Sequence, residues 1–510
     1  MYAKPCGIAG FAGAAWLAFL PMAGRLAAEA PRLLKVGFAE ADITPAVGME
    51  QPGGYGKSYH RSFHDACKVR AAVLDDGLHR VAVVGIDALA VHREMVQEAR
   101  RAIARRTGIP AGAILMCASH SHSSGPVFGV RRGEYDHASP LVQALAYDQS
   151  TVVDAKYYAH VQDEIVAAAC QADASRVEAG CGVGRGSEAR VSFNRRFRMT
   201  NGRTFTHPGQ NNPDIVEAAG PIDPDVGVIG AWDKQGKLLG CLVNFACHAT
   251  TSPGGISANY VYYLEQTIRG VFGPKTVVVF LAGACGDVTQ VDNRSPSANP
   301  GGERWAQRVG GSVGAEAVKV LATMDAAALM PVDAKSAVLN IARRRPSPER
   351  VRKCLELLEK DRGKVDPTEW LFAKEIVLLD AMLARQPTAE VEVQAVQIGP
   401  AVLVANPAEF FCQLGLDIKA KSRFPFTFPV TLANGCVGYV PTEEAFGPHG
   451  GGYETRLTSY SNLEITAGPQ IVAAASNLLG RMTPGERPVA PTAPPFKRPW
   501  SYGNVAPEIE

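Results

Sequence analysis

Two histidines separated by one residue, His120 and His122, form the pattern with the clearest capacity for chemistry. They directly follow an apolar run over residues 114–118, which predicts a short buried strand. Because side chains alternate between the two faces of an extended chain, both imidazoles are expected to point to the same side. Neutral imidazole is a preferred ligand of a borderline metal such as zinc, so the pair predicts a metal site. The competing interpretation is that two histidines lie together by chance on a polar loop.

Other polar residues also follow closely after apolar runs, as the two histidines do. Four runs that predict strands end near residues 118, 246, 281 and 405. Each is closely followed by residues that could bind a metal or move a proton: His120 and His122, His248, Asp287, and Glu409. In open α/β sheets, ligands bind beyond the carboxyl ends of the strands. If the four strands share a sheet, these side chains converge, which favours a metal site over a chance pairing.

The elements that must position these residues predict an α/β fold with α+β character. Mixed sheet layers are expected, flanked by helices, with the metal site at the strand ends. Strand-like runs cover residues 69–74, 80–91, 226–232, 238–246, 276–281, 390–398 and 401–405. Helical spacing of apolar residues covers residues 93–107, 155–172, 260–272 and 303–324. Two charged amphipathic segments predict a helical insertion over about residues 347–385. The glycine-rich residues 182–224 predict surface loops that carry substrate contacts, and no internal repeat is evident.

The composition excludes some classes of protein. A chain of 510 residues with 46% apolar content can bury one large core or two ordinary ones. The formal net charge is only +2, from 52 basic and 50 acidic residues, so no nucleic-acid partner is expected. None of the 11 cysteines forms a Cys-x-x-Cys pair, which argues against a thiolate zinc site.

The two ends of the chain differ from its middle. Residues 1–30 combine Lys4, a nearly uncharged apolar stretch and Ala28-Glu29-Ala30, the pattern of a secretory signal peptide. A membrane anchor is the alternative, but a stretch of about 17 apolar residues is short for a span. We therefore expect export, to the periplasm or out of the cell, and one catalytic domain over residues 31–482. Residues 483–510 are proline-rich and predict a tail.

Five short motifs occur along the chain in a definite order. They are Ala39-x-x-Asp42-Ile-Thr-Pro45, Ser119-His-Ser-His-Ser-Ser-Gly-Pro126, Asn244-Phe-Ala-Cys-His-Ala-Thr250, Gly286-Asp-Val-Thr289 and Gly438-Tyr-Val-Pro-Thr-Glu-Glu444. Together they resemble the neutral/alkaline, non-lysosomal ceramidase family. The similarity covers roughly residues 36–479, the catalytic domain of that family. Each motif is weak alone, whereas their combination is specific.

The resemblance implies a zinc-dependent amidase that hydrolyses the N-acyl amide bond of ceramide to a fatty acid and sphingosine. The family holds Zn²⁺ with two histidines, a glutamate and a tyrosine, which match His120, His248, Glu409 and Tyr439 in this sequence. Further family residues that line the same pocket are matched by His122, Arg195 and Tyr453. A lipid-like N-acyl amide as substrate would also imply peripheral contact with a membrane surface.

The sequence departs from the family pattern at two points. The family commonly carries Gly-Asp-Val-Ser-Pro-Asn, whereas this chain has Gly286-Asp-Val-Thr289-Gln290. Thr289 keeps a hydroxyl and is retained as a candidate catalytic residue. Full-length family members also carry an immunoglobulin-like domain after the catalytic domain, and here only the proline-rich tail is expected in its place. Ceramide and other amides therefore both stay open as substrates.

The implied chemistry assigns a role to each residue type. Zinc would lower the pKa of a water molecule towards about 7 and polarise the amide carbonyl, with Glu409 as the negative ligand. His122 would take and return a proton, and Tyr453 or Arg195 would donate to the developing oxyanion.

Two alternatives remain. The same zinc site could act on another amide, such as an N-acyl amino acid or a small peptide-like compound, or the scaffold could be a non-catalytic binding module. A serine hydrolase is disfavoured, because the Gly-x-Ser-x-Gly match at residues 310–314 falls inside a predicted helix.

Overall fold

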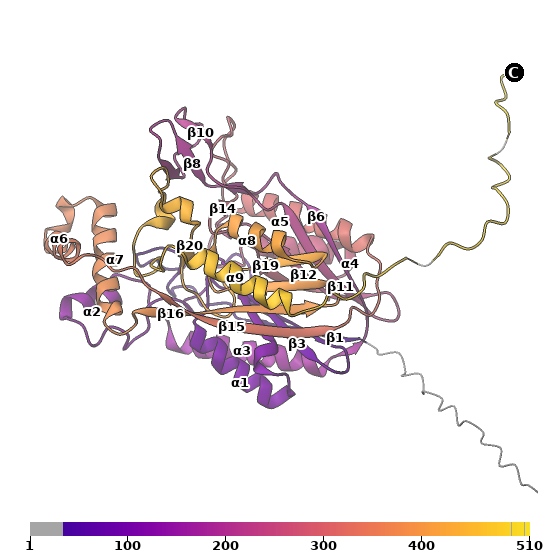
Figure 1. Cartoon of the computed structure of the whole chain (residues 1–510), viewed down its shortest axis with the longest axis horizontal. Helices are drawn as coiled ribbons and strands as arrows, with labels where there is room; N and C mark the ends of the chain where they lie inside the picture. The colour runs from indigo at the N-terminus through magenta and orange to yellow at the C-terminus, as the bar shows by residue number, and fades with distance from the viewer. Residues whose placement is uncertain (1–33, 491, 504) are drawn as a thin grey trace, which may run out of the picture. The chain divides into compact units, whose positions relative to one another are not determined.

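The computed structural model describes residues 34–490, 492–503 and 505–510. The expected signal peptide lies outside the described residues, so it stays a prediction, and so does the export that it implies. Within the described residues, mixed sheets are flanked by helices (Figure 1), as the sequence predicts.

Three sheets make up most of the structure. In spatial order, the first sheet contains β4 (Ile114–Ala118), β3 (Arg80–Ile86), β2 (Lys68–Asp75), β1 (Lys35–Asp42) and β5 (Val177–Glu178). The second sheet contains β13 (Val277–Ala282), β12 (Leu238–Phe245), β11 (Asp225–Trp232) and β6 (Gly180–Ser187). The third sheet contains β15 (Val332–Ala342), β16 (Thr388–Ile398), β17 (Ala401–Ala405) and β19 (Phe426–Val430).

The three sheets share one plan of strand pairing. In each sheet, three strands pair antiparallel in chain order, the first with the second and the second with the third. A helix then leads to a further strand, which pairs in parallel with the third. The parallel pairs are β3 with β4, β12 with β13, and β17 with β19. The helices that join them are α1 (Arg93–Thr107), α4 (Tyr260–Phe272) and α8 (Cys412–Lys421). We call each sheet with its helices a unit, so the fold contains three units of matching topology.

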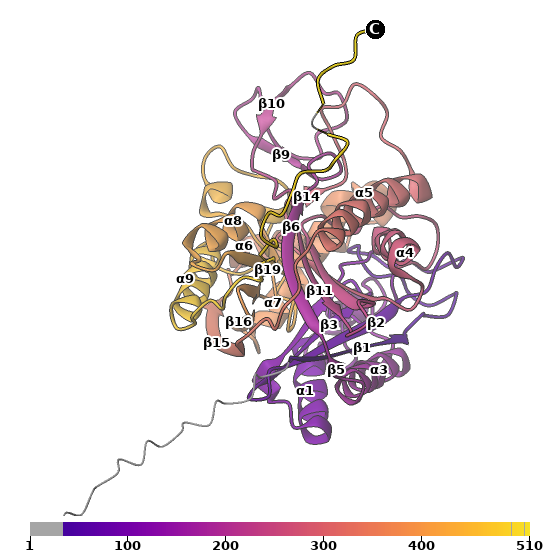
Figure 2. The same cartoon turned by 90° about the vertical axis from the view of Figure 1, so that its right-hand side faces the viewer.

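A second helix completes each unit. These helices are α3 (Ala155–Ala174), α5 (Gly302–Ala322) and α9 (Ala467–Gly480), which pack beside α1, α4 and α8 respectively. Figure 2 shows the three helix pairs on three different sides of the strands. In each unit, two helices therefore cover one face of the sheet, and the other face is turned towards the other two units.

The buried strands and helices follow from their residue types. All residues of β4 and β13 are buried, which suits their continuous apolar sequences, since parallel strands covered on both faces have no polar side. Helix α1 buries Met95, Val96, Ala99 and Ile103 on one face, and it ends where Gly108 adopts φ +75° and its N–H bonds to the Ala104 oxygen.

Hydrogen bonds join the carboxyl ends of the three parallel pairs. Leu432, just beyond β19, accepts from the Ala118 N–H at the end of β4 at 3.1 Å. The Thr431 N–H donates to the oxygen of Ala282, the last residue of β13, at 2.8 Å. The strand ends of all three units are thus tied together, and the loops that follow them must share one region.

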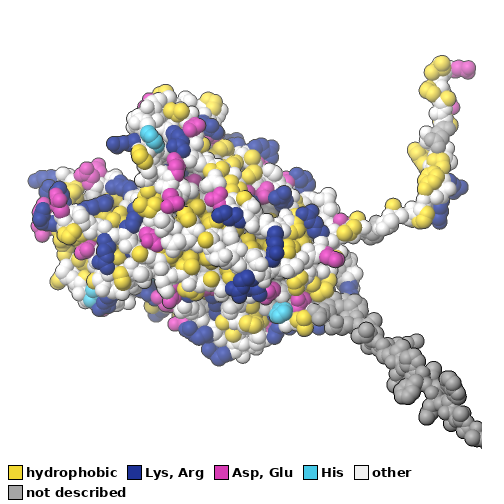
Figure 3. Space-filling view, viewed as in Figure 1, with side chains coloured by type: hydrophobic (Ala, Val, Ile, Leu, Met, Phe, Trp, Pro, Cys, Tyr) yellow, Lys and Arg dark blue, Asp and Glu magenta, His cyan; other side chains and the backbone are white. Residues whose placement is uncertain are grey.

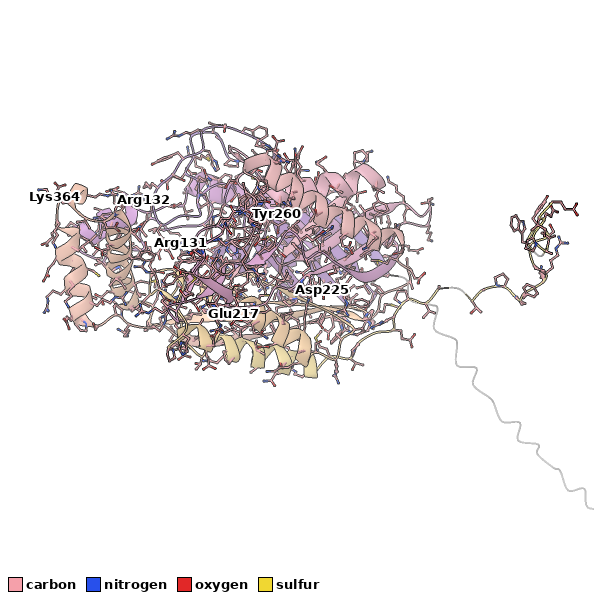
Figure 4. All side chains as sticks on the ribbon, turned by 90° about the horizontal axis from the view of Figure 1, so that it is seen from above. Arg131, Arg132, Glu217, Asp225, Tyr260 and Lys364 are labelled. Carbon is pink, nitrogen blue, oxygen red and sulfur yellow. The ribbon has the colours of Figure 1, made fainter. Side chains whose placement is uncertain are left out.

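Two parts of the chain extend beyond the three units. Helices α6 (Pro348–Leu358) and α7 (Pro367–Leu383) lie between β15 and β16 in the chain, and α7 packs on α2 (Pro140–Tyr147). Figure 4 shows Lys364, in the turn between α6 and α7, at the periphery, whereas Tyr260 of α4 lies among packed side chains. A small sheet of β10 (Ile215–Ala218), β8 (Arg196–Met199) and β9 (Thr204–Thr206) forms the second extension.

Two-residue strands complete the structure near the strand ends. β7 (Phe193–Asn194) pairs with β14 (Val288–Thr289), and β18 (Glu409–Phe410) pairs in parallel with β20 (Tyr439–Val440). Ten cysteines between Cys67 and Cys436 are free. Among the described residues no helix combines the length and the apolar character that a membrane crossing requires. Basic and acidic side chains are interspersed on the face in Figure 3, in line with the small net charge.

Several sequence expectations differ from the structure. The strand expected over residues 80–91 ends at Ile86, because the chain turns there to carry Asp87–Leu89 into the shared region of the strand ends. Helices α2, α8 and α9 were not predicted from the sequence. The segment 182–224 contains five of the strands, including most of β6, and not only surface loops.

Candidate metal centre

Three histidines converge beyond the strand ends. His120 and His122 follow β4 of the first unit, and His248 follows β12 of the second unit. One ring nitrogen from each lies within 4.8 Å of the others, and His120 and His248 are buried. The sequence predicted this convergence, and the structure confirms a cluster that could hold a metal ion.

The two neighbouring histidines reach the same side for a different reason than expected. The chain is not extended at His120, where φ is +63°. This left-handed turn brings the rings of His120 and His122 to a centroid separation of 4.8 Å, nearly perpendicular to one another. A non-glycine residue in this region carries strain on the order of 1–3 kcal/mol, which the surrounding contacts must offset.

Backbone carbonyls fix the orientation of two of the rings. His120 Nδ1 lies 2.9 Å from the Leu89 oxygen, and His248 Nδ1 lies 2.6 Å from the Cys285 oxygen. Because a carbonyl oxygen only accepts, each Nδ1 carries the proton. In the neutral ring Nε2 is then left with a lone pair, and carbonyl contacts of this kind are typical of metal-bound histidines.

Glu409 supplies the third unit's contribution. Its carboxylate Oε2 lies 3.2 Å from His120 Nε2 and 3.0 Å from His248 Nε2. Since those nitrogens have no proton to give, Oε2 lacks a hydrogen-bond partner among the described residues. Three buried lone pairs that face one point repel each other unless a cation lies between them. The donor set of imidazole nitrogens and a carboxylate oxygen fits a zinc-type cation.

The electrostatics agree with this donor set. Burial lowers the pKa of His248 to about 4, and the neighbouring Arg195 guanidinium adds to the shift. Burial also lowers the pKa of His122 well below its usual value. For Glu409, burial opposes the charged form, but positive charge at the cluster, present when His120 or His248 is protonated, holds its pKa well below the ordinary range. Neutral imidazoles beside an ionised carboxylate are the protonation states that a metal requires of its ligands.

Tyr439 is held beside Glu409 by the backbone. The two residues are direct partners in the β18–β20 pair, and Tyr439 is buried. Gly438 makes this approach feasible, because it adopts φ +76° and a Cβ there would lie 1.8 Å from the Tyr460 oxygen. The Tyr453 hydroxyl lies 2.8 Å from the Tyr439 hydroxyl, so the two phenols form a pair next to the cluster.

Arg195 is buried behind the cluster, and each of its nitrogens is engaged. Nε donates to Glu454 at 2.7 Å, and Nη2 donates to the Tyr439 hydroxyl at 3.1 Å and to the Gly286 oxygen at 2.8 Å. Nη1 lies 3.3 Å from His248 Nε2. Arg195 therefore contacts two of the candidate ligands at once, and Glu454 fixes it in place.

Tyr460 was not identified from the sequence. Its hydroxyl donates to Glu409 Oε1 at 2.7 Å, so it orients the carboxylate whose other oxygen faces the histidines. Asp287, ambiguous from the sequence, accepts from the Cys412 N–H and from Asn194 Nδ2, both at 2.8 Å. It thereby joins the start of α8 to the segment that carries Arg195.

A loop near the N-terminus of the first unit holds His122. Gln51 Nε2 donates to the His122 oxygen at 2.7 Å. Gly53, at φ +121°, lies so close to the ring that a Cβ there would be 2.5 Å from His122 Nδ1. This contact fixes the position of His122 from the side opposite the cluster.

A cavity of about 480 Å³ opens beside the cluster. This volume lies within the range of about 300–1,000 Å³ that is usual for small-molecule sites. Five of the candidate residues border it, namely His120, His122, Glu409, Tyr439 and Tyr453. Apolar side chains such as Phe128, Leu378 and Met382 share the wall with several charged ones.

The remaining candidates lie behind this wall. His248 and Arg195 contact the residues that border the cavity but do not border it themselves. Thr289 is buried in β14, and its hydroxyl accepts from the Val291 N–H at 3.1 Å. Thr289 is also absent from the described cavity wall.

Comparisons with known proteins find likeness in structure. No family model matches the sequence, and no curated protein matches it. The neutral ceramidase from Pseudomonas aeruginosa superposes with a TM-score of 0.65 at 20% identity, over 90% of this chain and 77% of that one. The chain has the neutral ceramidase fold. A ceramidase complexed with C2 gives a TM-score of 0.63 at 18% identity, with the same coverage of the two chains. The resemblance that the motifs predicted is thus confirmed for the neutral ceramidase fold.

Proposed function

We propose that this protein is a zinc-dependent amidase that hydrolyses N-acyl amides, with ceramide as the first substrate to test. The observation that carries the proposal is the convergence of His120 Nε2, His248 Nε2 and Glu409 Oε2 beside a ligand-sized cavity. The likeness to two solved ceramidases supports an amide bond as the target.

His120, His248 and Glu409 would hold the zinc ion, with Tyr439 as the fourth ligand. When bound there, zinc would supply a nucleophile at neutral pH by lowering the pKa of water to about 7, and it would polarise the amide carbonyl. His122 borders the cavity beside His120, and a neutral imidazole there would accept a proton and return it to the leaving nitrogen.

Two further side chains complete the proposed chemistry. Tyr453 borders the cavity, so its hydroxyl would donate to the carbonyl oxygen as negative charge develops, a contribution of roughly 3–4 kcal/mol in comparable sites. Arg195 is assigned a positioning role, because its nitrogens already contact Tyr439, Gly286, Glu454 and His248. No role in catalysis is proposed for Thr289, whose hydroxyl bonds its own turn.

The test is fatty-acid release from ceramide and from smaller N-acyl amides by the purified protein. The activity is measured before and after metal is stripped, and again after zinc is restored, with metal content determined in parallel. His120→Ala is compared with His79→Ala, a control that removes an exposed histidine. We expect about one zinc per chain, activity that follows zinc, and loss of activity in His120→Ala alone.

Each outcome separates the alternatives. Release from small amides but not from ceramide would keep the amidase and discard the lipid substrate. Zinc binding without release from any amide would favour a non-catalytic binding module. A protein that binds no zinc would contradict the proposal. Export is proposed from the sequence of residues 1–30 alone, and the N-terminal residue of the mature protein would test it.

A further inference from the structure

The cavity wall carries several charged side chains besides its apolar ones. Most of them form ion pairs with one another or with a neighbour. Arg93 pairs with Glu390 at 2.9 Å, Arg131 pairs with Glu94 at 3.1 Å, and Glu375 pairs with Lys374 at 3.1 Å. These pairs have their charges compensated within the protein and do not require a ligand.

Arg343 is the exception among the basic residues of the wall. It follows β15 directly and is half-buried, and it forms no ion pair within the described chain. Its Nη1 donates to Asn462 Oδ1 at 2.5 Å, whereas its buried Nε has no partner among the described residues. Burial lowers the pKa of Arg343. A guanidinium in this setting has donors left for an anion.

Glu134 is the corresponding exception among the acidic residues. It borders the same cavity, is half-buried, and pairs with no basic side chain of the described residues. Its Oε2 accepts from the Arg131 N–H at 3.0 Å, and its second oxygen has no hydrogen-bond partner in the part of the chain that the structure describes. Burial raises the pKa of Glu134, and Arg343 is among the neighbours that partly oppose this shift.

Arg343 and Glu134 lie close enough to shift each other's pKa, but neither forms an ion pair within the described residues. Two opposite charges side by side on one wall complement a ligand that carries both charges. We propose that Arg343 and Glu134 bind the zwitterionic end of the substrate, an α-amino acid acylated through its side-chain nitrogen, as in an ε-N-acyl-lysine. Arg343 takes the carboxylate and Glu134 the ammonium group. The acyl chain lies along the apolar part of the wall, which includes Phe128, Leu378 and Met382.

This inference rests on the proposed amide hydrolysis and names the substrate class for it. Water adds to the carbonyl carbon, the carbon–nitrogen bond breaks, and the nitrogen leaves with a proton. The products are a fatty acid and a free diamino acid. Ceramide would leave both charges of the wall without partners, because it carries neither a carboxylate nor an ammonium group.

The experiment uses four amides that share one acyl chain and one linker. The first is ε-N-acyl-lysine, and the others lack its α-amino group, its carboxylate, or both. Binding to the metal-free protein is measured by calorimetry, and hydrolysis is then measured with the zinc-loaded protein. We expect the zwitterion to bind roughly tenfold more tightly than either singly charged amide, a difference of about 1.4 kcal/mol.

Two variants assign each charge to its partner. Arg343→Gln should abolish the preference for the carboxylate and keep that for the ammonium, whereas Glu134→Gln should do the opposite. Glutamine at position 134 can still accept from the Arg131 N–H, and Arg343→Lys tests whether charge alone suffices. If Arg343 only supports the loop around Asn462, Arg343→Gln would weaken all four amides equally, and this would overturn the inference.

The remaining outcomes are equally decisive. Equal binding of the four amides by the unmodified protein would overturn the inference even if every amide is hydrolysed. A preference for the zwitterion without hydrolysis would support the inference and contradict the proposed function. The two proposals therefore fail separately.

Discussion

Tyr460→Phe should weaken zinc binding by about 10- to 100-fold. The substitution removes a single hydroxyl, which donates to Glu409 Oε1 at 2.7 Å. A hydrogen bond to a charged acceptor contributes about 1.5–3 kcal/mol, and each 1.4 kcal/mol corresponds to a factor of ten in affinity. Loss of a residue that orients a metal ligand costs a similar factor in other metal sites. Two independent estimates thus give the same range.

The assay is a competition titration of the metal-free protein with zinc and a chromophoric chelator. Tyr263→Phe is the matched control, because the Tyr263 hydroxyl also donates to a carboxylate, that of exposed Glu303 at 2.9 Å. Zinc affinity should be unchanged in this control. An affinity of Tyr460→Phe within twofold of the unmodified protein would refute the argument that Tyr460 orients a metal-binding carboxylate.

Three further predictions concern separate features. Gly53→Ala should lower kcat roughly 10- to 100-fold, because the added Cβ would displace His122. Gly54→Ala is the control and should leave kcat unchanged, since a Cβ there would meet nothing within 4 Å. Equal kcat values for the two variants would contradict the argument that Gly53 positions His122. Burial lowers the pKa of His92 to about 4, so the folded protein excludes a proton that the unfolded chain binds near pH 6.5. The free energy of unfolding should therefore fall by up to about 3 kcal/mol as the pH drops from 6.5 to 4. The free energy of unfolding of His92→Gln should depend less on pH, and an unchanged pH dependence would contradict the assignment to His92. Glu454→Gln removes the negative charge of the buried ion pair with Arg195 and should lower the free energy of unfolding by about 3 kcal/mol. The measurement is urea denaturation, and an unchanged midpoint would contradict the prediction.

The strands and the main residues of the cluster could be predicted because their signals are local. Apolar runs such as residues 277–282 are too long and too continuous for exposed loops, and a polar residue directly after such a run lies at a strand end. His120, His248 and Glu409 each follow such a run, but the assumption that their strands share one sheet was wrong, because β4, β12 and β17 belong to three different sheets. The residues converge instead because hydrogen bonds between Ala118 and Leu432 and between Thr431 and Ala282 join the strand ends of the three sheets.

Tyr460 and Glu454 could not be predicted, because their roles depend on contacts between distant segments. Tyr460 lies in a polar loop without periodicity, and its partner Glu409 is far away in the sequence. Glu454 meets Arg195 only after two separate loops fold against each other. The left-handed turn at His120 was missed for a related reason, since the pattern His-x-His fits an extended chain equally well. The matching topology of the three units was also invisible, because it is preserved in strand order and not in residue identity.

The three-unit plan has a consequence for how the protein assembles. His120, His248 and Glu409 come one from each unit, so a fragment that lacks any unit cannot form the cluster. A cation could bind at the cluster only after all three units have docked, so its binding free energy would stabilise only the fully docked protein. It would link segments that are far apart in the chain, and bringing such segments together costs the unfolded chain conformational entropy. Cation affinity would then report completed folding, and the last docking event along the folding pathway would be the one that creates the site.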